Sequence, residues 1–187
     1  MHVDRSLAWV TVRTPLPTGD LRVLMTDRGV VAAAYTPEGA AGLPAGPEIR
    51  NPSDDRRAAA VVSRIAEYFA GRRRELDLPI DWRSTSGIQA AVLRTLQQTV
   101  GYGETITYGA LAERSGVFEE ESAEPGYAAR TVGTIMSTNP VSLLVPCHRV
   151  VAADGLGGFG SVGLDVKRWL LTLEGVLPPT LDWTGPG

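Results

Sequence analysis

Apolar and polar residues alternate near the start of the chain in a way that predicts three antiparallel strands. Residues 8–14 alternate and are rich in β-branched side chains, which is typical of a strand with one buried face. Two further strands are expected at 21–26 and 30–36, separated by the tight turn at 27–29. Gly, Pro and Ala dominate residues 37–52, so we expect a surface loop after this meander.

A helical period of apolar residues replaces the alternation after residue 52. Ser53-Asp54-Asp55 can cap a helix that runs to Ala70, and Gly71 can end it. The predicted core face of this helix consists of Val61, Ile65, Tyr68 and Phe69. The arginine triplet at 72–74 is interpreted as a solvated loop rather than a phosphate site. An extended segment at 76–82 then leads to a domain boundary, which we place near residues 80–84.

The second half of the chain predicts mainly helices. Thr85 or Ser86 caps the first, and Gly101-Tyr102-Gly103 breaks it. The expected helices are 87–100 with the core residues Ile88, Val92, Leu93 and Leu96, then a short helix capped by Thr107 that runs through Arg114 and stops at Gly116, then 126–137, and finally 166–174. The second and third are joined by a loop at 117–125 and are similar to a helix-turn-helix.

These elements predict an α/β protein of two domains. The N-terminal domain, residues 1–83, contains the antiparallel sheet and its helix. The C-terminal domain, residues 84–187, is mainly helical and carries the winged-helix-like helix-turn-helix. A chain of 187 residues with 43% hydrophobic and 21% charged residues has the size and composition for packed cores of this kind.

The charge distribution does not predict a strong nonspecific DNA binder. The net charge is −3, and residues 84–187 hold six Lys and Arg against ten Asp and Glu. Four of these carboxylates lie in the loop between the two central helices: Glu119, Glu120, Glu121 and Glu124. If a DNA-reading helix follows this loop, we expect the loop to point away from phosphate.

The first nine residues lack the pattern of a secretory signal, and no apolar run approaches the length of a membrane span. A single cysteine excludes an intramolecular disulfide framework and a multi-cysteine zinc site. The second histidine, His2, lies at the N-terminus. We therefore expect a cytoplasmic protein with no membrane partner, no metal and no cofactor.

The candidate chemistry lies in Pro146-Cys147-His148-Arg149-Val150, which holds the only cysteine and one of the two histidines. The preceding residues 141–145 are predicted to form a short buried strand, and a glycine-rich loop follows at 155–163. A lone cysteine is more often a packed apolar residue than a nucleophile. Adjacent residues of an extended segment point to opposite sides, so Cys147 and His148 can cooperate only through a backbone bend or a bridging water.

This pentapeptide, with Asn139-Pro140 before it and Gly157-Gly158-Phe159 after it, resembles the active-site signature of the O6-alkylguanine-DNA alkyltransferases. The resemblance extends from Gly101 to Gly175. It implies a monomeric repair protein without a cofactor, which binds double-stranded DNA, flips out O6-alkylguanine and transfers the alkyl group to Cys147 irreversibly. O4-alkylthymine is left open as a further substrate.

The resemblance also assigns roles in the reaction. His148 takes the thiol proton through water and Glu174 orients the imidazole, while Tyr108 donates a hydrogen bond to the leaving guanine. The backbone carbonyls of Cys147 and Val150 accept from the exocyclic amine of guanine. The loop that closes the pocket contains Phe159, Gly160 and Ser161, and Phe159 stands where the family usually has tyrosine.

For DNA binding, the resemblance makes Arg130 the finger that fills the gap left by the flipped base. Thr131 and Gly133 lie on the same groove helix, Tyr108 also faces DNA, and Asn139 joins the helix-turn-helix to the active-site loop. Two alternatives stay open. The first is a non-catalytic alkyltransferase-like protein, a group that lacks the cysteine. The second is a cysteine hydrolase, which needs a separate histidine where only His2 is available.

Overall fold

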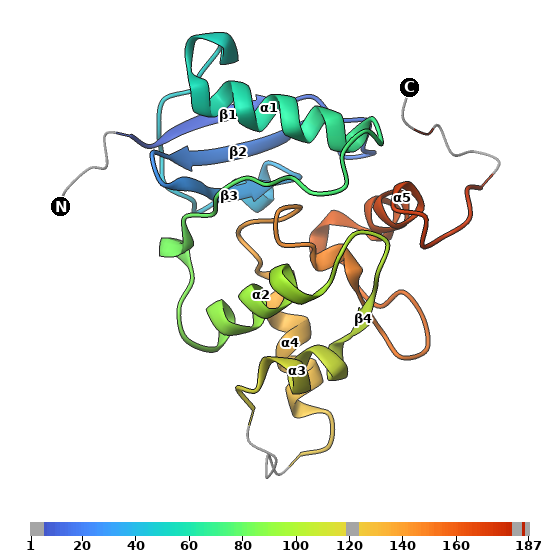
Figure 1. Cartoon of the computed structure of the whole chain (residues 1–187). Coiled ribbons are helices and arrows are strands. Elements are labelled where there is room, and N and C mark those ends of the chain that lie inside the picture. Colours follow the sequence, from blue (N-terminus) through green and yellow to red (C-terminus); the bar gives the residue numbers. More distant parts are fainter. Residues whose placement is uncertain (1–5, 119–123, 181–184, 186–187) are drawn as a thin grey trace. The chain divides into compact units, whose positions relative to one another are not determined.

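The structure is a computed structural model that describes residues 6–118, 124–180 and 185. The chain forms two compact units (Figure 1). The first contains the described residues up to Ser84 together with Pro140–Leu144 and Gly185, and the second contains the described residues of Thr85–Asn139 and Val145–Leu181. A small antiparallel sheet and five α-helices make this a mixed α/β protein within the described residues, as the sequence predicts.

The sheet of the first unit is the predicted meander. It consists of β1 (Ala8–Val12), β2 (Leu21–Thr26) and β3 (Gly29–Ala34), paired antiparallel in that order. β1 and β3 each end two residues before the predicted limit. The loop after β3 contains two short 3-10 helices, η1 (Glu38–Ala40) and η2 (Pro52–Asp54), and another, η3 (Trp82–Ser84), closes the unit.

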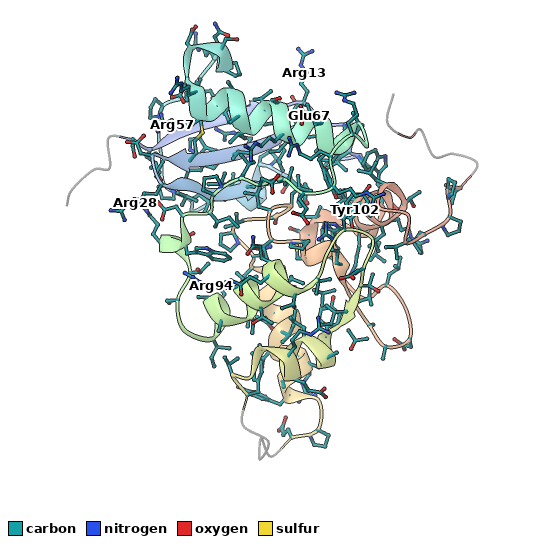
Figure 2. The ribbon with its side chains drawn as sticks, viewed as in Figure 1. Arg13, Arg28, Arg57, Glu67, Arg94 and Tyr102 are labelled. Atoms are coloured by element: carbon teal, nitrogen blue, oxygen red, sulfur yellow. The ribbon has the colours of Figure 1, made fainter. Side chains whose placement is uncertain are left out.

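Helix α1 (Arg56–Phe69) lies along this sheet, with Arg57 near its start and Glu67 near its end (Figure 2). Asp55 caps it by accepting from the backbone N–H groups of its second and third residues, as expected for an N-terminal aspartate. All four predicted core residues of the helix are buried. In the arginine triplet, Arg73 pairs with Glu67 at 2.8 Å and with Asp77 at 3.0 Å, which favours a structural role over phosphate binding.

The segment before the pentapeptide is not the predicted strand. Residues 141–145 form isolated bridges instead of a ladder: Val141 pairs in parallel with Ala33 of β3, and the Ala33 N–H donates to the Pro140 carbonyl at 2.8 Å. Leu143 has a φ of 72°, in the left-handed region that a continuing strand excludes. The prediction was wrong because buried apolar residues occur in a compact turn as well as in a strand. The chain leaves the first unit at Leu144, three residues before Cys147.

The second unit contains four helices among the described residues: α2 (Gly87–Thr99), α3 (Tyr108–Ser115), α4 (Tyr127–Ser137) and α5 (Leu164–Leu173). Thr107 caps α3 and Gly116 ends it in a left-handed conformation, as predicted. Val92, Leu93 and Leu96 are fully buried, but Ile88 is 48% exposed. The prediction that Ile88 is a core residue was wrong. Ile88 lies on the first turn of α2, where the apolar period of the helix extends beyond the part of the helix that is buried.

A pair of two-residue strands that the pattern did not predict completes this unit. β4 (Ile106–Thr107) pairs in parallel with β5 (Val150–Val151), so Ile106 faces Val150. β4 leads directly into Tyr108, and β5 directly follows the Cys-His-Arg turn. The pairing therefore brings Tyr108 to the cysteine across about forty residues of sequence. Within the described part of the chain, no helix has the length and apolar character to cross a membrane.

Candidate active site

Cys147 lies on a 3-10 turn rather than on an extended segment. This turn, η4 (Cys147–Arg149), follows Pro146, whose carbonyl accepts from the Arg149 N–H at 2.9 Å. The Val150 N–H donates to the Cys147 carbonyl and closes the turn. The backbone therefore bends between Cys147 and His148, which meets the condition for the two side chains to cooperate. Both residues are buried, with Cys147 5% exposed.

The carboxylate of Glu174, just after α5, forms the centre of a buried polar cluster. His148 Nε2 lies 2.9 Å from one oxygen, which also accepts from Arg149 Nη2 at 2.8 Å. The other oxygen accepts from Arg149 Nε at 2.9 Å and from the Gly103 N–H at 3.4 Å. Arg149 Nη1 donates to the Val100 carbonyl. This bidentate contact from Arg149 fixes the Glu174 carboxylate, which in turn orients the His148 imidazole.

Burial lowers the pKa of His148, and this outweighs the attraction of the Glu174 carboxylate. Burial by itself raises the pKa of Glu174, but the charges and hydrogen bonds of His148 and Arg149 outweigh it and leave the pKa lowered. The imidazole is therefore neutral beside a charged carboxylate. Its Nε2–H donates to Glu174, and Nδ1 has no hydrogen-bond partner among the described residues. This tautomer presents an unprotonated nitrogen, as a general base requires.

Tyr108, the first residue of α3, reaches the glycine-rich loop and donates to the Gly158 carbonyl at 3.3 Å. Burial and the negative charge of Cys147 raise the pKa of Tyr108, so the phenol stays protonated and remains a donor. Gly157, at φ 69°, packs against the same ring, and a Cβ there would lie 2.9 Å from a ring carbon. Phe159 follows, and Gly160 and Ser161 lie in the 3-10 turn η5 (Gly160–Val162).

No role was predicted for Lys167 on α5, yet its ammonium group contacts two backbone carbonyls of the candidate site. Nζ donates to the Val150 carbonyl at 2.7 Å and to the Gly158 carbonyl at 3.0 Å. Val150, predicted to accept from guanine, thus already accepts from lysine, although a carbonyl has a second lone pair. One signal could have identified Lys167: it is the only lysine among 18 Lys and Arg residues.

Arg130 lies on the exposed face of α4, where a groove-reading residue is expected. Its guanidinium group donates to the Pro125 carbonyl and to Glu124 Oε2, both at 3.0 Å. It also covers Gly126, where a Cβ would approach Nη1 to 3.2 Å. Glu124 belongs to the acidic loop, so this part of the loop touches the predicted finger. Glu119, Glu120 and Glu121 lie outside the described residues.

The predicted DNA helix also contains Thr131, directly after Arg130, and Gly133. A Cβ added to Gly133 would meet nothing within 4 Å, so packing inside the chain does not require a glycine at this position. At the end of α4, Asn139 is buried and its Nδ2 donates to the Val145 carbonyl at 3.1 Å. Asn139 therefore links the helix to the strand-free segment that leads into Cys147.

Comparison with known proteins gives consistent similarities. The family of the 6-O-methylguanine DNA methyltransferase DNA binding domain matches residues 87–176. A methylated-DNA–protein-cysteine methyltransferase of Mycolicibacterium paratuberculosis is 46% identical over 120 residues, which is 64% of this chain and 66% of that protein. A DNA base-flipping protein of Thermus thermophilus is 39% identical over 171 residues, covering 87% of this chain and 98% of that protein.

Among solved structures, Mycobacterium tuberculosis OGT in complex with DNA superimposes with a TM-score of 0.72 at 33% identity. That match covers 89% of this chain and 92% of the other. The match to the M. paratuberculosis relative spans slightly less than two thirds of that protein's length. The match to the OGT structure, in contrast, includes both units of the present fold.

Proposed function

This chain belongs to the methylated-DNA–protein-cysteine methyltransferase family, and we propose that it repairs DNA by direct reversal. The alkyl group of O6-alkylguanine moves to the sulfur of Cys147, and the product is a thioether. Each molecule therefore acts once. The observation that carries this proposal is the buried His148–Glu174 pair, whose neutral imidazole belongs to the residue that follows Cys147, the only cysteine of the chain and itself buried.

The proposed reaction begins with ionisation of the thiol. His148 Nδ1 receives the thiol proton through a water molecule, and Glu174 stabilises the imidazolium that forms. The thiolate attacks the alkyl carbon, a carbon–sulfur bond forms, and the carbon–O6 bond breaks with its electron pair moving to the guanine. The Tyr108 hydroxyl donates to the leaving base and offsets the charge that develops there. Its raised pKa supports this role as a donor.

We further propose that the base reaches Cys147 after flipping out of the duplex, because the O6 substituent cannot be attacked inside the stack. Helices α3 and α4 form the helix-turn-helix of a winged-helix-like C-terminal domain, with Thr131 and Gly133 on the groove helix. Arg130 fills the gap in the base stack. The exposure of Arg130 and the open space at Gly133 support this assignment. A similar protein, M. tuberculosis OGT, was crystallised with DNA.

In the proposed substrate pocket, the carbonyls of Cys147 and Val150 accept from the guanine amine, and Phe159, Gly160 and Ser161 close over the alkyl group. Asn139 holds the segment before the cysteine. We propose a division into domains at residues 1–83 and 84–187, and a monomer that works in the cytoplasm. Alkyl groups larger than methyl, and O4-alkylthymine, belong to the substrates to be tested.

The second candidate function is lesion binding without chemistry, in the manner of an alkyltransferase-like protein. It rests on the similarity to the Thermus thermophilus DNA base-flipping protein. Cys147 argues against it, because a lesion binder has no need of a thiol on the same turn as a neutral histidine that a fixed carboxylate orients.

The test is intact-mass analysis after incubation with duplex DNA that contains O6-methylguanine. We expect the mass of one methyl group, located on Cys147 by peptide mapping and missing in Cys147→Ala, which still binds DNA. Binding of the lesion without any mass gain supports the lesion-binding alternative. Repeated turnover, or methyl on another residue, rejects the proposal.

A further inference from the structure

Lys167 is the only lysine of the chain, whose other basic residues at neutral pH are arginines. It is also the one cation in the described residues that is fully buried, with no exposed surface. The two side chains differ physically, since arginine is a planar group that stays charged whereas lysine is a compact charge whose pKa responds to burial. The only ammonium side chain of the protein therefore lies at a position where burial affects its pKa.

The contacts of Lys167 join two parts of the candidate active site. Val150, which accepts from Nζ at 2.7 Å, is the residue whose N–H closes the turn on the Cys147 carbonyl. Gly158, which accepts at 3.0 Å, also accepts from the Tyr108 hydroxyl. One ammonium group therefore fixes the cysteine turn to the loop that contacts Tyr108. A methionine of similar length offers none of these hydrogen bonds.

The groups around Nζ interact with its positive charge. The rings of Tyr108 and Phe159 lie 5.9 and 5.8 Å away, within the range of cation–π attraction. Burial lowers the pKa of Lys167 to about 8, while the charge of Cys147 acts in the opposite direction. The ionisable side chains that interact with it are Cys147 and His148 on the turn and Tyr108 on α3. Of these, only Cys147 carries a negative charge in the reaction.

We propose that Lys167 is a positioning residue of the alkyl transfer, which holds the cysteine turn against the glycine-rich loop and favours the thiolate of Cys147. This inference rests on the proposed function, because a stabilised thiolate matters only if the sulfur is the nucleophile. An opposite charge in a poorly solvated site favours the ionised form of its partner. The effect is reciprocal, so alkylation of Cys147 to a neutral thioether removes the attraction and lowers the pKa of Lys167.

The first experiment uses the unaltered protein. Because there is one lysine, lysine labelled with ¹³C at the ε carbon gives a single side-chain NMR signal, and the pKa of Lys167 is read from its titration. We expect the titration midpoint near 8 to fall after Cys147, the only thiol, is alkylated with iodoacetamide. Iodoacetamide needs no repair activity, so this result does not depend on the proposed function. An unchanged midpoint after complete alkylation overturns the proposal.

The second experiment compares Lys167→Met, Lys167→Arg and a matched control, Arg168→Met, which removes a cation from the exposed face of the same helix. The readouts are the pH dependence of Cys147 alkylation by iodoacetamide and the rate of transfer from free O6-benzylguanine. Lys167→Met is expected to raise the half-ionisation pH of the thiol by about one unit, which means tenfold less thiolate at pH 7. Lys167→Arg restores the half-ionisation pH, and Arg168→Met leaves it unchanged.

A folded Lys167→Met protein whose thiol titrates as in wild type rejects the electrostatic role. If Lys167→Met does not fold, the NMR titration of the unaltered protein decides alone. A shift in thiol titration without any transfer from O6-benzylguanine or alkylated DNA supports the role of Lys167 in ionising the thiol but rejects the proposed repair function. The two hypotheses therefore fail separately.

Discussion

Arg130 forms an ion pair with Glu124 at 3.0 Å, so the arginine predicted to enter DNA is held against the loop that precedes its own helix. The same guanidinium group donates to the Pro125 carbonyl. Both side chains are largely exposed, at 61% and 76%, so the contact is screened by solvent and is readily broken. Insertion into a base stack requires Arg130 to exchange these partners for DNA.

Arg130→Ala should slow repair of O6-methylguanine in duplex DNA far more than transfer from free O6-benzylguanine. Flipping a base costs a few kcal/mol, which corresponds to a factor of about 100 or more, and the free base does not need it. Single-turnover rates on the two substrates measure the difference. Equal losses on both would show that Arg130 supports the fold of α4 instead.

Glu124→Gln should accelerate duplex repair, because it frees Arg130 from its carboxylate partner. An exposed ion pair contributes about 1 kcal/mol or less, so the gain should not exceed about fivefold, with DNA affinity changed by less than about threefold. Glu113→Gln is the matched control, since Glu113 is exposed on α3 and its substitution removes the same charge. A gain of tenfold or more in affinity at low salt that disappears at high salt would instead place the acidic loop at the DNA interface.

Gly157→Ala should slow alkyl transfer by displacing Tyr108. The new Cβ would lie 2.9 Å from a carbon of the Tyr108 ring and 3.1 Å from its hydroxyl oxygen, and the φ of 69° disfavours any side chain. Gly155→Ala is the matched control in the same loop, because its Cβ meets nothing within 4 Å. Transfer from O6-benzylguanine should fall in the first variant and stay unchanged in the second. Equal rates in both variants would mean that the position of Tyr108 does not affect the reaction.

Local patterns predicted much of the fold because local forces determine it. The limits of β2 and the caps of α1 and α3 follow from alternation, an N-terminal Asp or Thr and a following Gly, all of which act within a few residues. The prediction of a strand at 141–145 was wrong although its apolar residues are buried, and the prediction that Ile88 is buried was wrong, because both depend on how distant segments pack. The pairing of β4 with β5 is only two residues long, too short for a periodic signal.

The candidate site was predicted from a motif rather than from geometry. The motif pointed to His148 and Glu174, which the structure brings within 2.9 Å, although 26 residues separate them. It could not indicate that Arg149 fixes the same carboxylate, because that bond depends on where α5 ends. Lys167 was missed since an interior lysine on a helix looks like an ordinary surface residue until its burial is known.

Tyr108→Phe should lower the rate of transfer while DNA affinity stays close to that of wild type. The hydroxyl acts mainly as the guanine leaves, so its removal affects the transition state more than the bound complex. Loss of one such donor typically slows a reaction by about 100-fold or more. Rates at saturating DNA, compared with binding of Cys147→Ala and Tyr108→Phe/Cys147→Ala proteins, separate the two effects. A defect confined to affinity would make Tyr108 a DNA contact only.

Burial of neutral His148 should make the protein less stable in mild acid. Its pKa in the folded state lies below the ordinary value of about 6.5, so between these two pKa values the unfolded chain binds a proton that the folded protein does not. The free energy of unfolding is therefore insensitive to this group above pH 6.5 and falls as the pH drops below it, by at most about 1.4 kcal/mol per unit.

The measurement is urea denaturation of the wild type and of His148→Gln at pH 7.0 and 5.5. We expect the wild type to lose about 1 kcal/mol more than the variant over this interval, because glutamine does not titrate. Glu174, whose pKa is also lowered, contributes to acid sensitivity only below its unfolded value of about 4.5, and so does not interfere in this window. Equal losses in both proteins would mean that folding does not lower the pKa of His148. A smaller loss in the wild type than in the variant would mean that the folded state raises this pKa and holds the imidazole protonated, so that Nδ1 could not accept the thiol proton and the transfer would need another base.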